Sequence, residues 1–321
     1  MSQTTSSTSE PGGVLIVGSI TADLTTFSQR LPAGGETILG DDFTLVLGGK
    51  GANQAVSAAL AGASAHIVGC VGTDLFSGMV TDGLLRAGVN IDHVRRVEGP
   101  TGIAHIRVDE SGENDIVMVP LANGSLNEEQ IDEAFADRAA SSRVLLTQLE
   151  IPWALTQYAI RKAHQNGLTV VLDPAPAAVL DDEIWPLVDI VTPNETEARI
   201  LTGIPVTDVE SAVSAGRWFI NRGARHALVT MAAAGAVLVS GDEVTRFDAI
   251  PVTAVDTTAA GDAFAGYLGA ALALGNELPD AIRHAIAAGA LAVTRRGASP
   301  SLPQRADVDA LLEAQRAPAP R

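Results

Sequence analysis

The sequence predicts an α/β fold: a doubly wound, mostly parallel sheet with helices on both faces. Short apolar runs alternate along the chain with longer runs of helical period, which is typical of strand–helix–strand units. Glycine closes several of the helical runs, as at Gly62 and Gly88. The chain has 321 residues, of which 46% are hydrophobic, and can therefore bury a full core. We expect a single α/β domain over residues 14–315.

The individual elements follow this alternation in order. A strand at 14–19 precedes a helix at 52–61, and a strand at 66–71 precedes a helix at 75–87. Parallel strands bring their carboxyl ends to one edge of a sheet, where the ligands of such folds bind. Later pairs are expected at 144–149 with 152–165, 169–172 with 181–187, and 190–192 with 194–201, before a helix at 209–221 and a strand at 227–230.

Two regions, 24–46 and 94–119, break this alternation. Each contains short alternating segments separated by Pro, Gly and Asp turns, with no helical run between them. They predict a small antiparallel sheet that extends from the main domain as a β lid. A small sheet with one apolar face has to cover something, either the mouth of a site, a partner subunit, or both.

Charge and composition exclude several classes of protein. A formal net charge of −17 disfavours binding to nucleic acids or anionic membranes. The same charge would repel a nucleotide, so that Mg²⁺ and backbone dipoles have to attract its phosphates. Residues 1–13 predict a disordered tail without the features of a signal peptide, and the longest uncharged apolar stretch, 263–275, is too short to span a membrane. The single cysteine, Cys70, suits a reducing compartment, so we expect a soluble cytoplasmic protein.

The segment Asp256–Gly266 predicts an anion-binding helix start. It follows a β-like run at 249–255 and precedes an apolar run of helical period, which indicates a strand, a tight turn and a helix. Ala259, Ala260 and Gly261 would leave the free N–H groups of the first turn open to a phosphate. Asp262 adds a carboxylate that can accept a proton there. The alternative is a turn whose Asp only caps a helix.

A second glycine-rich turn, Gly48–Ala55, opens the helix expected at 52–61. Lys50 is followed by Gly51 rather than Ser or Thr, so the turn is not a P-loop. The first strand is not followed by the G-x-G-x-x-G of a dinucleotide site. Bare backbone and the Asn53 amide suit a small polar ligand. The alternative is a structural turn that requires positive φ.

Together these motifs resemble the ribokinase family of PfkB-type carbohydrate kinases. The resemblance spans about residues 14–305 in the order of the family's motifs. It rests on Gly18–Asp23, Gly48–Gln54, Gln148–Glu150, Asp173–Ala177, Thr192–Glu197, Asp256–Gly266 and Ala292–Ser301.

The resemblance implies a role for each motif. Asp262 is the implied catalytic base, and Ala259, Ala260 and Gly261 form the implied anion hole. The implied sugar contacts are Thr21, Asp23, Gly49, Lys50, Gly51, Asn53 and Glu150, besides Asp262. The alternatives are a turn-forming Asp at position 23 and a helix-start acid at position 150.

The resemblance also implies a nucleotide site and two metal ions. Asn194 and Glu197 would help to position Mg²⁺ and the phosphates of ATP, although this segment is also a good helix start. The loop of Thr230, Met231, Ala232, Ala233, Ala234 and Gly235, with Gly261, would lie along the nucleotide. A K⁺ site is implied at Asp256, Thr258, Ala292, Arg295, Gly297 and Ser301, mostly through backbone carbonyls.

The implied function is ATP-dependent, Mg²⁺-assisted and K⁺-activated phosphorylation of D-ribose at its 5-hydroxyl, in a homodimer formed through the lid. The alternatives are another acceptor, such as 2-deoxyribose, another pentose or a nucleoside, and a catalytically silent sugar-binding protein. Four positions depart from the family pattern. Thr21 replaces an Asn that contacts the sugar, while Ala232, Ala234 and Ile286 replace residues near the nucleotide.

Overall fold

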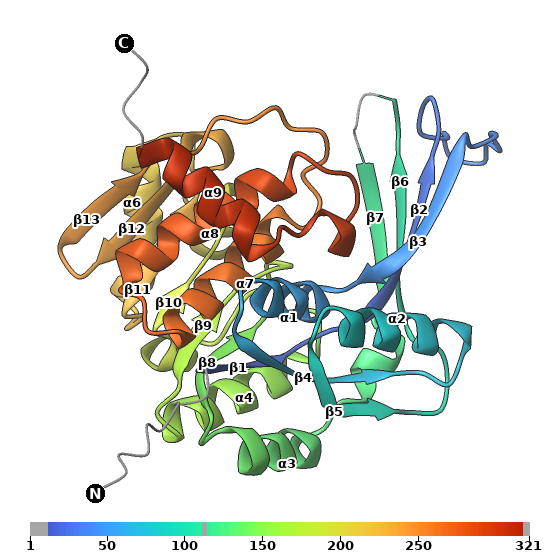
Figure 1. Cartoon of the computed structure of the whole chain (residues 1–321). Helices are drawn as coiled ribbons and strands as arrows, with labels where there is room; N and C mark the ends of the chain where they lie inside the picture. The colour runs from blue at the N-terminus through green and yellow to red at the C-terminus, as the bar shows by residue number, and fades with distance from the viewer. Residues whose placement is uncertain (1–11, 111–113, 317–321) are drawn as a thin grey trace, which may run out of the picture.

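A computed structural model describes residues 12–110 and 114–316 of the chain. The tail expected at 1–13 lies outside these residues except for its last two glycines. The described residues form a large sheet and a small sheet, which projects to one side of the molecule (Figure 1). The strands of the large sheet are β1 (Gly13–Val17), β4 (Ser64–Val71), β5 (Asn90–Arg96), β8 (Ser142–Thr147), β9 (Thr169–Leu172), β10 (Ile190–Val191), β11 (His226–Thr230), β12 (Ala236–Ser240) and β13 (Glu243–Phe247).

The large sheet confirms the predicted doubly wound α/β fold. Among the described residues it has nine strands in the order β13-β12-β11-β10-β9-β8-β1-β4-β5. Neighbouring strands from β5 to β11 are parallel, whereas β12 and β13 are antiparallel. The carboxyl ends of the parallel strands therefore lie at one edge, as in other open α/β sheets.

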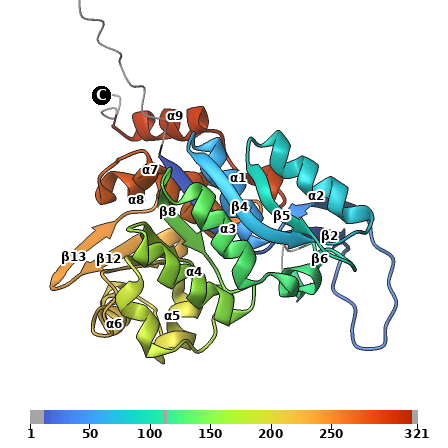
Figure 2. The same ribbon diagram turned by 90° about the horizontal axis from the view of Figure 1, so that it is seen from below.

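Helices cover both faces of the large sheet because its strands are apolar on both sides. In β1, Val14 and Ile16 pack into one core cluster, while Leu15 and Val17 pack into the other. The two helical layers are seen on opposite sides of the sheet in Figure 2. One layer contains α1 (Lys50–Leu60), α2 (Leu75–Arg86), α7 (Ala260–Ala273), α8 (Leu278–Ala292) and α9 (Arg305–Arg316), and the other contains α3 (Glu128–Arg138), α4 (Trp153–Gln165), α5 (Glu195–Thr202) and α6 (Val209–Ile220).

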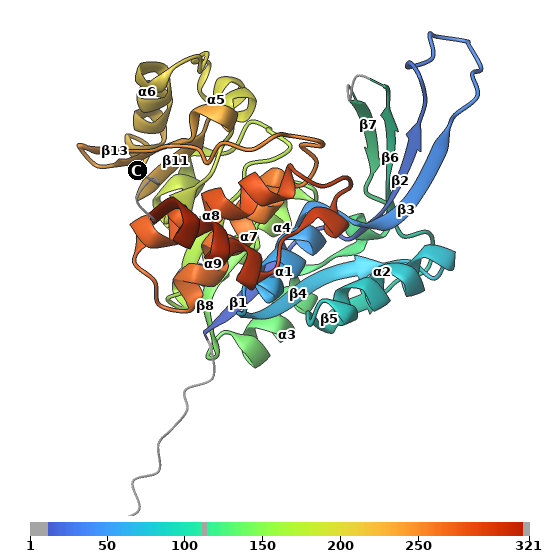
Figure 3. The ribbon, with the colours of Figure 1, turned by 45° about the horizontal axis from the view of Figure 1, so that its top comes forward.

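The small sheet lies where the sequence places the lid. It consists of β2 (Thr21–Phe27), β3 (Asp42–Gly48), β6 (Gly102–Val108) and β7 (Asn114–Val119), in the order β3-β2-β6-β7. The β2–β3 and β6–β7 pairs are antiparallel, and the central β2–β6 pair is parallel. Residues 94–96, expected here, belong to β5 of the large sheet instead. Figure 3 shows the small sheet standing away from the helical layers.

The main error of the sequence prediction concerns residues 249–255. They form an extended connection rather than a strand, since β13 ends at Phe247. Pro251 offers no N–H to a ladder, and Val252 and Val255 are exposed. Helices α3, α8 and α9 and the β12–β13 hairpin were also not predicted individually.

Candidate active site

Helices α1 and α7 meet at the carboxyl edge of the large sheet, and their N-terminal turns carry the predicted catalytic residues and several of the predicted sugar contacts (Figure 1). Their close approach requires a glycine, because a Cβ at Gly266 would lie 2.4 Å from the Cβ of Ser57. The Ser57 hydroxyl donates a hydrogen bond to the carbonyl of Ala263 at 3.0 Å. The residues 48–55 and 256–266, which are far apart in the sequence, therefore form one site.

The Gly48–Gly51 turn lies directly on the end of β1. Gly49 has φ 87°, a left-handed conformation that favours glycine, which agrees with the structural alternative considered for this turn. A Cβ at Gly51 would lie 2.6 Å from the carbonyl carbon of Gly18. The Ala52 N–H donates to the Ser19 carbonyl at 2.9 Å. The glycines thus allow α1 to begin against the backbone of β1, where the Gly51 N–H also donates to the Ser19 hydroxyl at 3.3 Å.

Asp262 is buried in the first turn of α7, and side chains of α1 hold both of its carboxylate oxygens. Asn53 Nδ2 donates to Oδ2 at 3.0 Å, and Gln54 Nε2 donates to Oδ1 at 3.2 Å. Lys50 Nζ lies 3.8 Å from Oδ1. The Asn53 Oδ1 atom is buried and has no hydrogen-bond partner within the described part of the chain. This acceptor is therefore available to a donor such as a sugar hydroxyl.

Lys50 pairs with a second buried carboxylate as well. Its Nζ lies 3.5 Å from Oδ2 of Asp173, the residue after β9. Burial of the Lys50 ammonium opposes its charge, but the facing carboxylates of Asp173 and Asp262 hold its pKa above the ordinary value. Burial raises the pKa of Asp173, and the charge of Lys50 opposes that rise. The Lys50 side chain therefore contacts the carboxylates of Asp173 and Asp262, while the backbone N–H of Lys50 donates to Glu150 Oε2 at 2.9 Å.

Asp23 and Glu150 line the side of the site that faces the small sheet. Asp23 is buried in β2, next to Gly48 of β3, where a Cβ would lie 2.0 Å from the Asp23 carboxyl group. The Thr21 hydroxyl donates to Asp23 Oδ1 at 2.7 Å. Glu150 Oε2 accepts a hydrogen bond from the Ser19 hydroxyl at 2.5 Å. The hydroxyl hydrogen of Thr21 is thus already used in the bond to Asp23. Ser19 also contacts the site, which the sequence did not indicate.

The first turn of α7 has the backbone expected of an anion site. Ala259 caps the helix with φ 59°, which turns the chain sharply into α7. The Ala260 N–H is hydrogen-bonded to the Thr257 carbonyl at 3.3 Å, so it is less free than predicted. The Gly261 N–H is in the first turn and has no intrahelical acceptor. A Cβ at Gly261 would meet no described atom within 4 Å, so the space beside its Cα is open.

The predicted nucleotide residues lie on neighbouring strand ends. Asn194 and Glu197 form a capping box at the start of α5, with Asn194 N and Nδ2 both donating to the Glu197 carboxylate at 2.9 Å. Burial raises the pKa of Glu197. The Thr230 N–H donates to the Pro193 carbonyl at 2.9 Å, which joins the two segments.

The loop Met231–Gly235 makes a tight turn after β11, closed by a hydrogen bond from Met231 N to the Gly235 carbonyl at 2.8 Å. Ala232 has φ 42° in this turn, a conformation that suits the glycine of the family pattern better than alanine. Ala233 and Ala234 continue the turn as a 3₁₀ helix. Ile286 lies half-buried on α8.

The Asp256 carboxylate joins the two loops of the predicted cation site. Oδ1 accepts from the N–H of Thr258 at 2.9 Å, and Oδ2 accepts from the N–H of Gly297 at 2.8 Å. Ser301 is buried in the 3₁₀ turn that follows, whereas the Arg295 guanidinium pairs with Asp307 at 3.2 Å. Arg295 and Ala292 would therefore offer only backbone carbonyls. Within residues 12–110 and 114–316, no cluster of three His, Cys, Asp or Glu side chains suits a metal ion.

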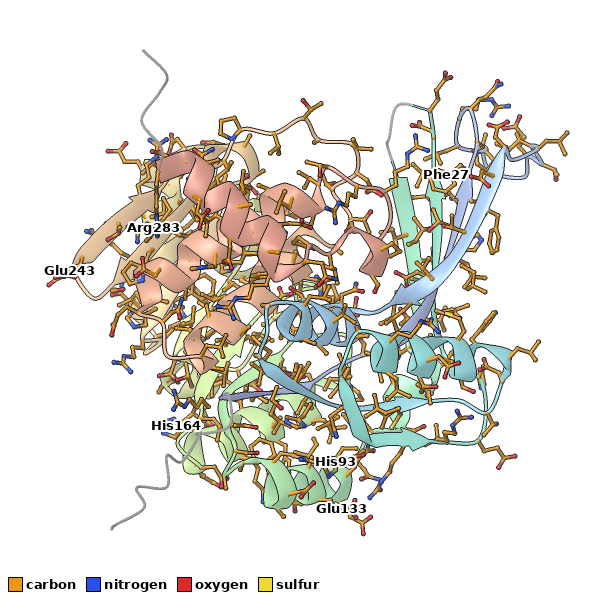
Figure 4. The ribbon with its side chains drawn as sticks, in the orientation of Figure 1. Phe27, His93, Glu133, His164, Glu243 and Arg283 are labelled. Atoms are coloured by element: carbon orange, nitrogen blue, oxygen red, sulfur yellow. The ribbon has the colours of Figure 1, made fainter. Side chains whose placement is uncertain are left out.

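A cavity separates these loops from the small sheet. It is lined by Asp23 and Phe27 of β2 and by Asp256 and Arg296 of the loops. The Arg296 guanidinium lies 5.9 Å from the centre of the Phe27 ring, which is labelled on the small sheet in Figure 4. The small sheet thus forms one wall of the site, on the side of Asp23.

Gln54 and Asp173 also belong to the site, although the sequence suggested no role for them. Both lie within the motifs, but a motif does not reveal that Gln54 contacts Asp262 or that Asp173 contacts Gln54 and Lys50. Asn123 was missed entirely, and it fixes β2 by accepting from the Ile20 N–H at 2.8 Å.

Comparison with known proteins defines the class of this site. The sequence model of the pfkB family carbohydrate kinases matches residues 12–305. The chain belongs to the PfkB family of carbohydrate kinases. The predicted class of enzyme, a sugar kinase, is therefore confirmed.

Within this family the chain is similar to ribokinases over most of its length. It is 40% identical to ribokinase of Haemophilus influenzae, over 93% of this chain and 97% of the relative. It is also 34% identical to deoxyribokinase of Salmonella typhi, over 90% of this chain and 95% of the relative. The structure of Arabidopsis thaliana ribokinase complexed with ribose and ATP superimposes with a TM-score of 0.86 at 31% identity, over 95% of this chain and 99% of that structure.

The buried Asp23 gives a testable link between the site and stability. Burial raises the Asp23 pKa from its ordinary 3.8 to about 7. The folded state therefore binds more protons than the unfolded state between these values, and the free energy of unfolding falls as the pH rises through them. Asp23→Asn removes the free-energy cost of burying an ionised carboxylate at high pH. We expect urea unfolding to show the variant more stable by up to a few kcal/mol at pH 8, with the advantage shrinking towards pH 4.

The control is Asp42→Asn, an exposed carboxylate on the neighbouring strand of the same sheet, which should change stability little at either pH. If Asp23→Asn and the parent protein have equal stability at pH 8, burial of the ionised Asp23 carboxylate does not destabilise the folded protein, and the prediction is wrong.

Proposed function

We propose that this enzyme transfers the γ-phosphoryl group of ATP to the 5-hydroxyl of D-ribose. The observation that carries the proposal is the pairing of a buried, hydrogen-bonded carboxylate, Asp262, with the Gly261 N–H of the same helical turn, at a residue with open space beside its Cα. A base beside an anion site is the arrangement that phosphoryl transfer to an alcohol needs. The similarity to ribokinases, one of them solved with ribose and ATP, supports the choice of both substrates.

In the proposed mechanism, Asp23, Asn53 and Glu150 bind sugar hydroxyls with the backbone of Gly49–Gly51. The Asp262 carboxylate accepts the proton of the 5-hydroxyl while the sugar oxygen forms its bond to the γ-phosphorus. The bond from that phosphorus to the bridging oxygen breaks, and ADP leaves. The Gly261 N–H, with Ala259 and Ala260 forming the turn, stabilises the negative charge on the transferring group.

Asn194, Glu197 and the loop Thr230–Gly235 form the proposed nucleotide site. Carboxylate and amide oxygens are ligands or water acceptors that suit Mg²⁺, and Glu197 offers a carboxylate fixed by two donors of Asn194. Mg²⁺, when bound, would neutralise charge on the phosphates of ATP. The strained Ala232 and the missing polar side chain at Ala234 make the loop's contribution to nucleotide affinity weaker than in the family pattern.

A K⁺ ion is proposed between the loops that Asp256 joins. The site would use backbone carbonyls near Thr258, Ala292, Arg295, Gly297 and Ser301, with the Asp256 carboxylate supplying negative charge. These loops lead directly into the anion-binding turn of α7, so an ion there would act by fixing Ala259 to Gly261.

The alternative acceptor is 2-deoxyribose. Thr21 donates its hydroxyl to Asp23, so it has no second donor for a sugar hydroxyl as an Asn amide would. The chain is also similar to a deoxyribokinase, at 34% identity. A catalytically silent sugar-binding protein is disfavoured, because the proposed base Asp262 is present and held by Asn53, Gln54 and Lys50.

We also propose a homodimer formed through the small sheet. By the strand register, one face of this sheet carries Phe43, Leu45, Val117 and Val119, all exposed, and Asp23 lies on the opposite face. Exposed apolar side chains on one face of a sheet are typical of a protein interface. No helix of the described chain could span a membrane. The free, buried Cys70 supports the proposed cytoplasmic location.

A coupled ADP-release assay over ribose, 2-deoxyribose, arabinose, a hexose and a nucleoside tests the proposed substrate. We expect ribose to be preferred, with a modest margin over 2-deoxyribose because Thr21 lacks one donor. Thr21→Asn should widen that margin, since one added hydrogen bond is worth roughly 0.5–1.5 kcal/mol. Turnover of the hexose or the nucleoside without turnover of ribose would refute the proposal.

Asp262→Asn tests the base. The amide keeps the size of the side chain but cannot accept the proton, so kcat should fall by about 10²–10⁴-fold while sugar binding changes little. Asp280→Asn is the matched control, because Asp280 also lies in the first turn of a helix, α8, and is exposed. A near-normal kcat for Asp262→Asn would remove Asp262 from the mechanism.

Activity should rise when K⁺ replaces a bulky organic cation at constant ionic strength, with Na⁺ less effective. Asp256→Ala should abolish this response, whereas Asp248→Ala, in an exposed position of the same connection, should keep it. Equal rates in all three cations would contradict the proposed site.

A further inference from the structure

Asp173 is a buried carboxylate that the proposed mechanism does not use. It follows β9 directly and is 6% exposed. Its Oδ2 accepts a hydrogen bond from Gln54 Nε2 at 2.8 Å and lies 3.5 Å from Lys50 Nζ. A carboxylate is buried only at a high cost unless its partners are well placed. The position of Asp173, one side chain away from Asp262, therefore calls for a role in the site.

Gln54 and Lys50 connect Asp173 to Asp262. The single amide nitrogen of Gln54 donates to both acids, at 2.8 Å to Asp173 and 3.2 Å to Asp262. The orientation of this amide is fixed because its Oε1 accepts from Gln148 Nε2 at 2.5 Å. Lys50 Nζ lies between the same two carboxylates, at 3.5 and 3.8 Å. Two donors that approach Asp262 are thus anchored on Asp173.

We infer that Asp173 is a positioning residue for the catalytic base. It holds Gln54 and Lys50 in place against Asp262 Oδ1, which leaves Oδ2 and its Asn53 contact facing the sugar. The Asp173 carboxylate also shares the Lys50 ammonium with Asp262, at 3.5 and 3.8 Å from Nζ, so that Lys50 is not paired with Asp262 alone. This inference rests on the proposed function, in which Asp262 is the base.

Other charged groups face Asp262 as well. They are Lys50 on α1, Asp23 on β2 and Glu197 on α5, besides Asp173 itself, and Glu150 after β8 acts on Asp23 and Lys50. Because these groups interact, the acid limb of a pH–rate profile reports the set rather than one residue. All of them except Asp173 remain in an Asp173 variant, so a change in the limb reports the loss of Asp173.

The test is the pH profile of kcat/KM for the sugar in Asp173→Asn. The amide oxygen can still accept from Gln54, so the fold is kept while the charge is lost. We expect the acid limb to move to lower pH by about one unit, because Lys50 then pairs with Asp262 alone. A weaker base should lower the plateau kcat roughly threefold. Asp189→Asn, a partly buried carboxylate that caps β9 at the opposite end from Asp173, is the matched control and should leave the limb unchanged.

A second variant, Gln54→Met, removes the shared donor without removing a charge. We expect kcat to fall by about 10–100-fold and KM for the sugar to change less than about threefold, since Asn53 and the sugar contacts remain. Gln130→Met is its control, because Gln130 is equally buried but donates to the carbonyls of Gly69 and His93, away from the site. Equal effects of the two Met variants would mean that Gln54 acts only through stability.

The outcomes separate this inference from the proposed function. If Asp262→Asn keeps its activity, the base assignment fails and the inference fails with it. If Asp262→Asn is inactive but Asp173→Asn, folded by its thermal melting curve, keeps the acid limb of the parent enzyme, only the role of Asp173 is overturned.

Discussion

Burial of several carboxylates around the Lys50 ammonium is the constraint on which the rest of the site depends. Asp173 and Asp262 lie within 4 Å of Nζ, at 3.5 and 3.8 Å, and Glu150 and Glu197 add to its field. Buried acids without a cation would take up protons or unfold the site. Lys50 can reach this position only because Gly49 and Gly51 let α1 begin directly on the end of β1.

The same arrangement explains why the site is costly when empty and suited to its substrates. Asp23 has a raised pKa because it is buried without a cation of its own. Sugar hydroxyls would supply the donors that Asp23, Glu150 and the unpartnered Asn53 Oδ1 need. The small sheet carries Asp23 and forms one wall of the site. A bound sugar would therefore stabilise the folded protein by offsetting part of the cost of burying these groups.

Much of the fold could be predicted because apolar alternation in strands such as β1 reflects burial on both faces. The sequence also predicted that the two glycine-rich turns lie in one site, since each precedes a helix at the carboxyl edge of the sheet. It did not distinguish the extended segment 249–255 from a strand, because β propensity there is not matched by a pairing partner. It also could not show that Gln54 contacts both Asp262 and Asp173, because these contacts depend on how α1, β9 and α7 pack in three dimensions.

In the proposed mechanism, Asp262 is the group held ready for the sugar's primary hydroxyl. The most direct measurement is a crystal structure of the enzyme with D-ribose and a non-hydrolysable ATP analogue. The account predicts the 5-hydroxyl oxygen within about 3 Å of an Asp262 carboxylate oxygen, with the γ-phosphoryl group facing the Gly261 N–H. A ribose whose 5-hydroxyl points away from Asp262, with the γ-phosphate far from the first turn of α7, would contradict it.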